Sequence, residues 1–109
     1  DQSTAISGSG PAYVFYLMQS FIEAATKIGL PLEDAKKLVY ETFAGACATA
    51  KKNLDDLDKL IKDVSSKGGT TEAAIKSFDE SNIKEIFNQG VKNAYNRALE
   101  INQENKKIN

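Results

Sequence analysis

The sequence predicts an all-helical domain, and three features lead to that prediction. Apolar residues recur at intervals of three and four along most of the chain, which is the spacing of one face of an α-helix. Proline and glycine stand where these periodic segments would begin and end. No stretch alternates polar and apolar residues long enough to form a convincing β-strand. We therefore expect about five helices in one domain, because 109 residues are too few for two ordinary domains.

The first predicted helix begins at Pro11, because proline is favoured in the first turn of a helix. Gly29 is expected to end it as a left-handed cap. Between them, apolar residues cover nearly every face of the helix: Tyr13, Val14, Phe15, Tyr16, Leu17, Met18, Phe21, Ile22, Ala25 and Ile28. A helix that is apolar all round must be buried all round. Since so short a chain cannot surround it, we expect a second copy of the chain to cover it.

The second predicted helix starts at Pro31 and carries an apolar stripe as far as Ala50, with acidic residues in its first turn. Its later half, residues 44–48, contains only alanine, glycine and cysteine. Side chains this small allow another helix to cross at short range, so we call residues 44–48 the slim face. A third, shorter helix is expected over residues 54–64, with one apolar edge formed by Leu57, Leu60, Ile61 and Val64.

Two further helices complete the prediction. A short one covers residues 71–80, and a long one starts at Asn82, which together with Glu85 resembles a capping box. The long helix would bury its apolar residues as far as Ile101, whereas the polar residues that follow are expected to fray. The predicted organisation is therefore a helical dimerisation and substrate-binding domain, 1–101, followed by a polar C-terminal tail, 102–109.

Composition excludes several classes of function. A net charge of −1 gives no reason to expect nucleic acid as a partner. The chain has no histidine, which removes the usual zinc sites and histidine-based proton transfer, and we expect no metal. Its one cysteine, Cys47, stands between alanines and is expected to be a small buried packing residue. The longest apolar stretch is too short to span a bilayer and no basic residues precede it, so we expect no membrane and a cytoplasmic location.

A polar loop with two adjacent glycines separates the third and fourth predicted helices: Ser65-Ser66-Lys67-Gly68-Gly69-Thr70-Thr71. The loop ends at a helix N-terminus, where free N–H groups and the positive end of the helix dipole favour a carboxylate or phosphate. Adjacent glycines also allow a ligand to approach the backbone closely. The alternative interpretation is a flexible turn in which Thr70 or Thr71 is an ordinary N-cap.

Three blocks of the sequence, taken together, resemble the C-terminal domain of the pyrroline-5-carboxylate reductase family. They are Thr4-Ala5-Ile6-Ser7-Gly8-Ser9-Gly10-Pro11-Ala12-Tyr13, then Gly29-Leu30-Pro31, then the segment from Val64 through the polar loop to Thr71. The resemblance extends from Asp1 to about Glu100 and implies an interlocked helical dimerisation domain that forms a homodimer. In this family such dimers can also assemble into rings. The chain departs from the family at Lys67, where proline is usual, and this changes the rigidity and the charge of the loop.

The resemblance also implies a reaction and a set of site residues. The family reduces 1-pyrroline-5-carboxylate to L-proline with NADPH or NADH. The substrate would be bound by Ser66, Gly68, Gly69, Thr70 and Thr71, and Thr71, as the catalytic residue, would also contact the ring nitrogen. Ser7, Gly8 and Gly10 would lie near the nicotinamide. An N-terminal dinucleotide-binding domain outside these 109 residues would hold most of the cofactor, so we expect the chain alone to be inactive.

Two functions from other classes stay open at the level of sequence. The chain could be a stand-alone helical interaction module that kept the dimer fold and lost the reaction. It could also be a small-acid-binding module that uses the loop at Thr71 without hydride transfer. The pair Gly8 and Gly10 is not a dinucleotide fingerprint, because a third glycine and a preceding strand are both missing.

Overall fold

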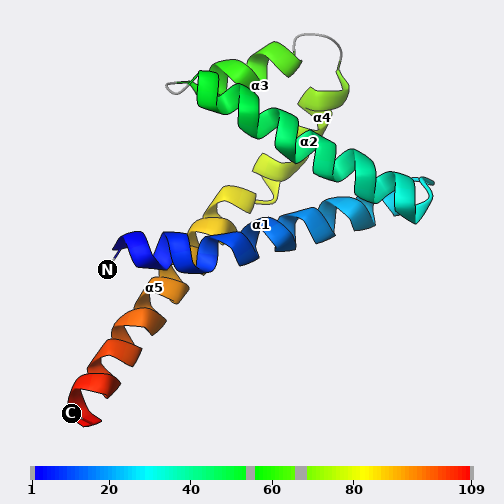
Figure 1. The fold of residues 1–109 in the computed structure, drawn as a ribbon. Helices are drawn as coiled ribbons and strands as arrows, with labels where there is room; N and C mark the ends of the chain where they lie inside the picture. The colour runs from blue at the N-terminus through cyan, green and yellow to red at the C-terminus, as the bar shows by residue number, and fades with distance from the viewer. Residues whose placement is uncertain (1, 54–55, 66–68, 109) are drawn as a thin grey trace. The chain divides into compact units, whose positions relative to one another are not determined.

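The computed structural model describes residues 2–53, 56–65 and 69–108, and over these residues the chain forms helices and no strand (Figure 1). The helices are α1 (Gln2–Lys27), α2 (Leu32–Lys52), α3 (Leu57–Ser65), α4 (Thr70–Glu80) and α5 (Ile83–Ile108). The predicted all-helical class and the number of helices are therefore confirmed. None of these helices is long and apolar enough to cross a membrane. The chain divides into two compact units, one of Asp1–Tyr13 with Ala73–Asn109 and the other of Val14–Glu72.

Helix α1 begins earlier than predicted. It starts at Gln2 and contains Pro11 in its interior, so the prediction that Pro11 opens the helix was wrong. A proline normally forces the preceding residue out of the α-helical region, partly through a clash with the Cβ of that residue. The preceding residue here is Gly10, which has no Cβ, and this relaxes the restriction. The helix can therefore continue through a proline that would otherwise end it.

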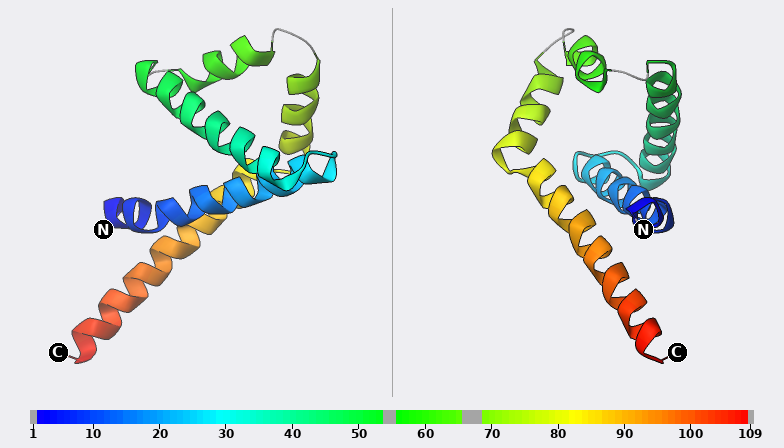
Figure 2. Two further views of the ribbon diagram at one scale, coloured as in Figure 1. Left: turned by 45° about the vertical axis from the view of Figure 1, so that its right-hand side comes forward. Right: turned by 90° about the vertical axis from the view of Figure 1, so that its left-hand side faces the viewer.

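The turn between α1 and α2 has the predicted chemistry. Gly29 has a φ of +115°, and its N–H donates to the carbonyl of Thr26 over 3.0 Å. The N–H of Leu30 donates to the carbonyl of Ala25 over 3.2 Å, which completes a Schellman motif. Pro31 takes the N-cap position of α2. Figure 2 shows the chain reversing direction at this turn, so α1 and α2 form a helical hairpin.

The junction between α4 and α5 differs from the predicted capping box. Asn82 has a φ of +58°, in the left-handed region, whereas an N-cap residue normally has extended backbone angles. Its N–H donates to the carbonyl of Asp79 over 3.1 Å, the bond expected of a residue that closes the preceding helix. Asparagine tolerates this conformation better than most residues because its short side chain can hydrogen-bond locally. Asn82 therefore closes α4, and its carbonyl also accepts a hydrogen bond from the N–H of Ile86 over 3.0 Å, so α5 starts from Asn82 as predicted but with left-handed backbone angles at that residue.

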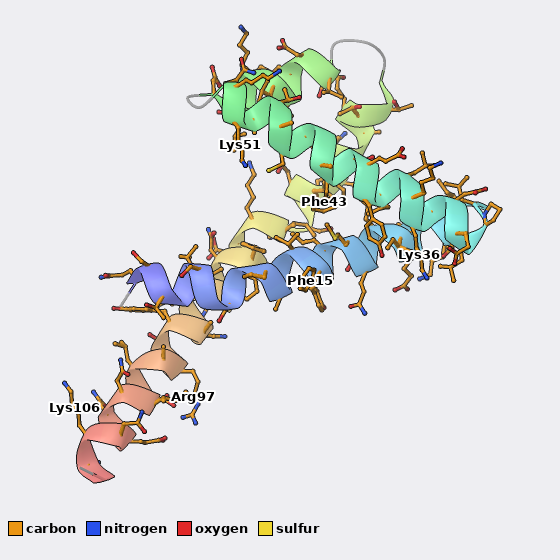
Figure 3. The ribbon with its side chains drawn as sticks, viewed as in Figure 1. Phe15, Lys36, Phe43, Lys51, Arg97 and Lys106 are labelled. Carbon is orange, nitrogen blue, oxygen red and sulfur yellow. The ribbon has the colours of Figure 1, made fainter. Side chains whose placement is uncertain are left out.

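The polar C-terminal residues continue α5 as far as Ile108 instead of fraying after Ile101. Arg97, labelled in Figure 3, pairs with Glu100 over 2.9 Å and reaches Glu104 over 3.4 Å, so one side chain spans two helical turns. Basic residues also occupy the last turn, where they interact favourably with the helix dipole. The boundary between a domain at 1–101 and a tail at 102–109 stays a prediction.

The described residues bury very little apolar surface. Their buried side chains are those of Ala5, Ala25, Ala35 and Val39. Large apolar side chains of α1 are instead exposed, including Phe15 at 64% and Tyr16 at 70%, and Figure 3 shows Phe15 projecting from the helix. These large apolar side chains therefore have little cover among the described residues.

Candidate functional site

The described part of the predicted substrate loop lies at the start of α4. Gly69 immediately precedes the helix and is exposed, Thr70 is its first residue, and Thr71 is its second and is half-buried. Both threonines therefore lie within the first turn, and the N-cap position falls on Gly69. This does not support the alternative interpretation in which Thr71 is an ordinary N-cap. The remaining predicted residues of the loop, Ser66 and Gly68, lie outside the described residues, as does Lys67.

The start of α4 can hold an anion through its backbone. The first N–H groups of a helix have no carbonyl partner within the helix, and they point along the axis away from it. Here those groups belong to Thr70, Thr71 and the next residue, Glu72, and the two threonines also bring a hydroxyl each to the same turn. The carboxylate of Glu72 also lies in this turn and contributes negative charge near the same dipole. An anion can therefore bind here only if its attraction to the N–H groups exceeds its repulsion by the Glu72 carboxylate.

Helix α3 fixes the other end of the loop. Ser65 is its last residue, and the Ser65 hydroxyl donates to the carbonyl of Ile61 over 2.8 Å. The hydroxyl is therefore engaged by its own helix. Asp56 caps the other end of α3 by accepting a hydrogen bond from the N–H of Lys59 over 2.8 Å.

The residues predicted to lie near the nicotinamide are all within α1. Ser7 and Gly8 are exposed and Gly10 is half-buried. A Cβ added to Gly8 or Gly10 would meet nothing within 4 Å, so neither glycine is required by packing inside the chain. Both have a cost, because glycine inside a helix is about 1 kcal/mol less favourable than alanine. These residues belong to one compact unit, and Gly69, Thr70 and Thr71 belong to the other.

Pro11 gives this part of α1 a specific chemical character. In a regular helix its N–H would bond to the carbonyl of Ser7, and proline has no N–H. The backbone here therefore offers a carbonyl acceptor beside two glycines with open space, and not the free N–H groups that bind phosphate. An acceptor of this kind suits the carboxamide of a nicotinamide better than a pyrophosphate. The residues present thus fit the predicted end of the cofactor.

The ionisable groups whose pKa values are shifted lie elsewhere on the described chain. Lys27 hydrogen-bonds to Glu23 over 2.9 Å and lowers the pKa of that carboxyl. Glu100 and Glu104 raise the pKa of Arg97. Neither pair belongs to the candidate site, and the described residues include no cluster of three or more acidic or cysteine side chains that could hold a metal ion. The described site therefore offers backbone N–H groups and threonine hydroxyls for binding.

The exposure of Cys47 differs from the prediction made from the sequence, and the environment of the Tyr13 hydroxyl was not predicted at all. Cys47 is exposed in the single chain, although its alanine neighbours predicted burial. Tyr13 packs edge-to-face on Phe87, with ring centroids 6.0 Å apart, and its hydroxyl is inaccessible to solvent and has no hydrogen-bond partner among the described residues. The apolar spacing of the sequence marked Tyr13 as a packing residue, and no sequence signal indicates an unpaired hydroxyl.

Comparison with known proteins agrees with the resemblance found in the sequence. Residues 1–101 match the family model described as pyrroline-5-carboxylate reductase dimerisation. The chain is 42% identical over 101 residues to a pyrroline-5-carboxylate reductase of Pseudomonas aeruginosa, and 38% identical over 104 residues to pyrroline-5-carboxylate reductase 2 of Bacillus subtilis. These alignments cover 93% and 95% of this chain, and 37% of each relative.

Solved structures give the same result. The chain is similar to a pyrroline-5-carboxylate reductase from Coxiella burnetii, with a TM-score of 0.85, 41% identity, and coverage of 91% of this chain and 37% of that one. It is also similar to a Plasmodium falciparum pyrroline carboxylate reductase solved with NADP bound, with a TM-score of 0.81, 36% identity, and coverage of 86% and 36%. The chain thus spans little more than a third of the length of these relatives. It belongs to the pyrroline-5-carboxylate reductase dimerisation family.

Proposed function

We propose that this chain is the dimerisation and substrate-binding part of a pyrroline-5-carboxylate reductase. The parent enzyme would reduce 1-pyrroline-5-carboxylate to L-proline with NADPH or NADH, as a cytoplasmic step of proline biosynthesis. The observation that carries the proposal is the start of α4, where two threonines occupy the first turn directly after an exposed glycine. The family membership of residues 1–101 supports it.

In this proposal the chain forms a homodimer. The exposed apolar side chains of α1 and the slim face of α2 would be covered by the second copy. The small number of buried side chains among the described residues and the exposed apolar side chains of α1 support this assignment. Assembly of such dimers into rings is a further prediction from the family resemblance.

The substrate is a five-membered cyclic imine with a carboxylate, and its two polar ends require different partners. The N–H groups of Gly69, Thr70 and Thr71 would hold the carboxylate, together with Ser66 and Gly68. The Thr71 hydroxyl can donate or accept a hydrogen bond and would orient the ring nitrogen. Its half-buried position at the start of α4 supports this role, because partial burial excludes competing water. The protein would thus supply position and electrostatics.

The nicotinamide cofactor supplies the hydride when it is bound. In this chain, Ser7, Gly8 and Gly10 would lie against the nicotinamide end, with the two glycines allowing a close approach to α1. The open space at both glycines and the carbonyl of Ser7 support this assignment. Most of the cofactor would be held by a dinucleotide-binding domain outside these 109 residues.

The test compares the full-length parent protein with the 109-residue chain. We expect the full-length protein to oxidise NADPH or NADH when 1-pyrroline-5-carboxylate is added. We expect no turnover from the chain alone, because it has no dinucleotide-binding fold to hold the nicotinamide near the substrate. A full-length protein that is folded and inactive with both cofactors would reject the reductase proposal in favour of a small-acid-binding module. Turnover by the chain alone would reject the proposed division of roles.

A further inference from the structure

We propose that the Glu72 carboxylate makes the site at the start of α4 selective for ligands that carry a cationic nitrogen beside their carboxylate, over ligands that are anions only. This inference rests on the proposed function, in which the N–H groups of Gly69, Thr70 and Thr71 hold the substrate carboxylate. It assigns Glu72 a role in substrate specificity that acts through charge.

Glu72 brings an unpaired carboxylate to the first turn of α4. It directly follows Thr71, and its side chain is exposed. Lys76 lies four residues further along the helix, at the spacing that favours an ion pair with Glu72. Lys76 instead pairs with Glu80 over 3.9 Å, and Glu72 has no hydrogen bond or ion pair with any described residue. Its charge therefore stays available to act on a ligand.

The position of Glu72 in α4 brings this charge near the proposed ligand. One turn of an α-helix rises about 5.4 Å, and each Cα–Cβ bond is tilted toward the N-terminus of the helix. The Glu72 side chain therefore leans toward the end of α4 at which the ligand would bind. Exposed charges interact over about 8 Å at physiological ionic strength. Glu72 thus repels a negative charge held by the N–H groups and attracts a positive charge beside it.

The proposed substrate and product both have a nitrogen that can carry such a positive charge. L-proline has a carboxylate and a protonated amine, and the imine nitrogen of 1-pyrroline-5-carboxylate becomes positive when it is protonated. Because the nitrogen is bonded to the carbon that bears the carboxylate, the attraction of Glu72 for the nitrogen offsets its repulsion of the carboxylate. For a carboxylate without the nitrogen, only the repulsion remains. Glu72 therefore confers specificity through an unfavourable interaction with the wrong ligand.

An acidic residue in a first turn also has a purely structural role, because it stabilises the helix dipole. That role acts equally on every ligand of the site, since it changes only the stability of α4. A dependence of the Glu72 effect on the charge of the ligand therefore separates selectivity from helix stabilisation.

The experiment compares two ligands of similar shape in the full-length parent protein. L-proline and cyclopentanecarboxylate share a five-membered ring with a carboxylate, and only L-proline has a nitrogen. Isothermal titration calorimetry at neutral pH gives the dissociation constant of each ligand in the presence of the preferred reduced nicotinamide cofactor, from which neither ligand can accept a hydride. Glu72→Gln removes the charge and keeps the size of the side chain, whereas Glu72→Asp keeps the charge. Asp79→Asn is the matched control, because it removes an exposed negative charge from α4 about 10 Å further along the helix.

We expect Glu72→Gln to strengthen the binding of cyclopentanecarboxylate by about threefold, the size of one charge–charge interaction across a helical turn in a largely aqueous environment. The affinity for L-proline should change by less than about twofold, because an attraction and a repulsion are removed together. The preference for L-proline over cyclopentanecarboxylate should therefore fall in Glu72→Gln. It should keep its wild-type value in Glu72→Asp and in Asp79→Asn.

Each contrary result identifies a different error. A folded wild-type protein that binds neither ligand would reject the proposed carboxylate site, and this inference with it. A Glu72→Gln protein in which both affinities change by the same factor would reject the selectivity and leave the carboxylate site standing. An equal loss of preference in Asp79→Asn would show that the overall charge of the protein sets the preference, and would overturn the assignment to Glu72.

Discussion

Gly45→Ala tests whether the slim face of α2 is covered in the functional assembly. Gly45 is exposed and lies in the interior of α2, and a Cβ added to it would meet nothing within 4 Å. The hydrogen bond that its carbonyl accepts from the Thr49 hydroxyl, over 3.0 Å, does not involve the added methyl group. Within the single chain the substitution therefore introduces no clash. Any unfavourable effect must come from a neighbour outside the chain.

Gly45→Ala should have opposite effects on stability when the slim face is open and when another helix covers it. In an open helix, replacing glycine with alanine stabilises by about 0.8–1.0 kcal/mol, because alanine loses less backbone entropy on folding. If a helix of the second copy crosses at the slim face, the added methyl group overpacks that contact and costs about 1–3 kcal/mol per site. Two sites per dimer then weaken association by about 2 kcal/mol or more, which raises the dissociation constant by about 30-fold or more.

The assay combines sedimentation equilibrium with chemical denaturation at several protein concentrations. We expect Gly45→Ala to weaken the dimer and to stabilise whatever folded monomer is present at low concentration. Lys36→Ala, nine residues before Gly45 and therefore on the opposite side of α2, is the control for an alanine substitution in the same helix that leaves the surroundings of Gly45 unchanged. A Gly45→Ala chain that keeps the wild-type dissociation constant and gains about 1 kcal/mol at every concentration would show that the slim face is open in the assembly.

Three further predictions follow from other parts of the chain. Thr71→Val in the full-length enzyme should lower kcat and raise KM. The fall in kcat/KM should correspond to about 1–3 kcal/mol of transition-state stabilisation, the size expected for one lost hydrogen bond. Full activity in a folded variant would refute the assignment of Thr71. Tyr13→Phe should stabilise the protein by about 1 kcal/mol in denaturant titrations, because it removes a buried hydroxyl that has no partner, and a destabilised variant would show that the hydroxyl is paired in the assembly. Arg97→Gln should reduce the helical circular dichroism signal and speed amide hydrogen exchange over residues 102–108. Unchanged exchange there would show that the ion pairs of Arg97 with Glu100 and Glu104 do not stabilise the end of α5.

The pair of Glu23 and Lys27 gives the C-terminal end of α1 a pH-dependent stability. Lys27 lowers the pKa of Glu23 below its usual value of 4.5. The stabilisation is therefore present above the unfolded pKa of Glu23 and is lost as the pH falls through the lower, folded value. Both side chains are exposed, so added salt should weaken the same contribution. Glu23→Gln should remove this acid-dependent step from the stability profile, and a step that persists in this variant would have to come from another carboxylate.

The parts of the fold that sequence predicted well depend on local chemistry. The helical spacing of apolar residues predicted the helices, and the turn was predicted because Gly29 tolerates a positive φ and Pro31 fixes its own φ. Pro11 was misread because its effect depends on the residue before it, and Gly10 removes the usual clash. Asn82 was misread because a cap and a left-handed turn favour the same residue type. In both cases the residue type was used to infer a backbone conformation, and the structure has a different conformation at that residue.

In the candidate site, too, the features set by local chemistry were predicted and the features set by tertiary packing were not. The adjacent glycines and threonines predicted a helix start, and α4 begins at Thr70. The sequence did not predict that the helix begins directly after Gly69, with both threonines inside its first turn, because Gly69, Thr70 and Thr71 are all acceptable residues at a helix start. The unpaired hydroxyl of Tyr13 depends on its contact with Phe87, which lies far away in the sequence and on another helix. Contacts of this kind are set by tertiary packing, and apolar spacing alone does not specify them.

The buried side chains of the described residues, three alanines and one valine, determine how stability must be measured for this protein. Alanine buries so little apolar surface that such a core offsets only a small part of the conformational entropy that folding removes. The exposed apolar residues of α1 and α3 supply the missing burial only when another surface covers them. Folding and association are then one process, and the apparent stability must rise with protein concentration. A substitution such as Gly45→Ala can therefore be interpreted only from measurements at several concentrations, because a single melting curve cannot separate a weakened chain from a weakened dimer.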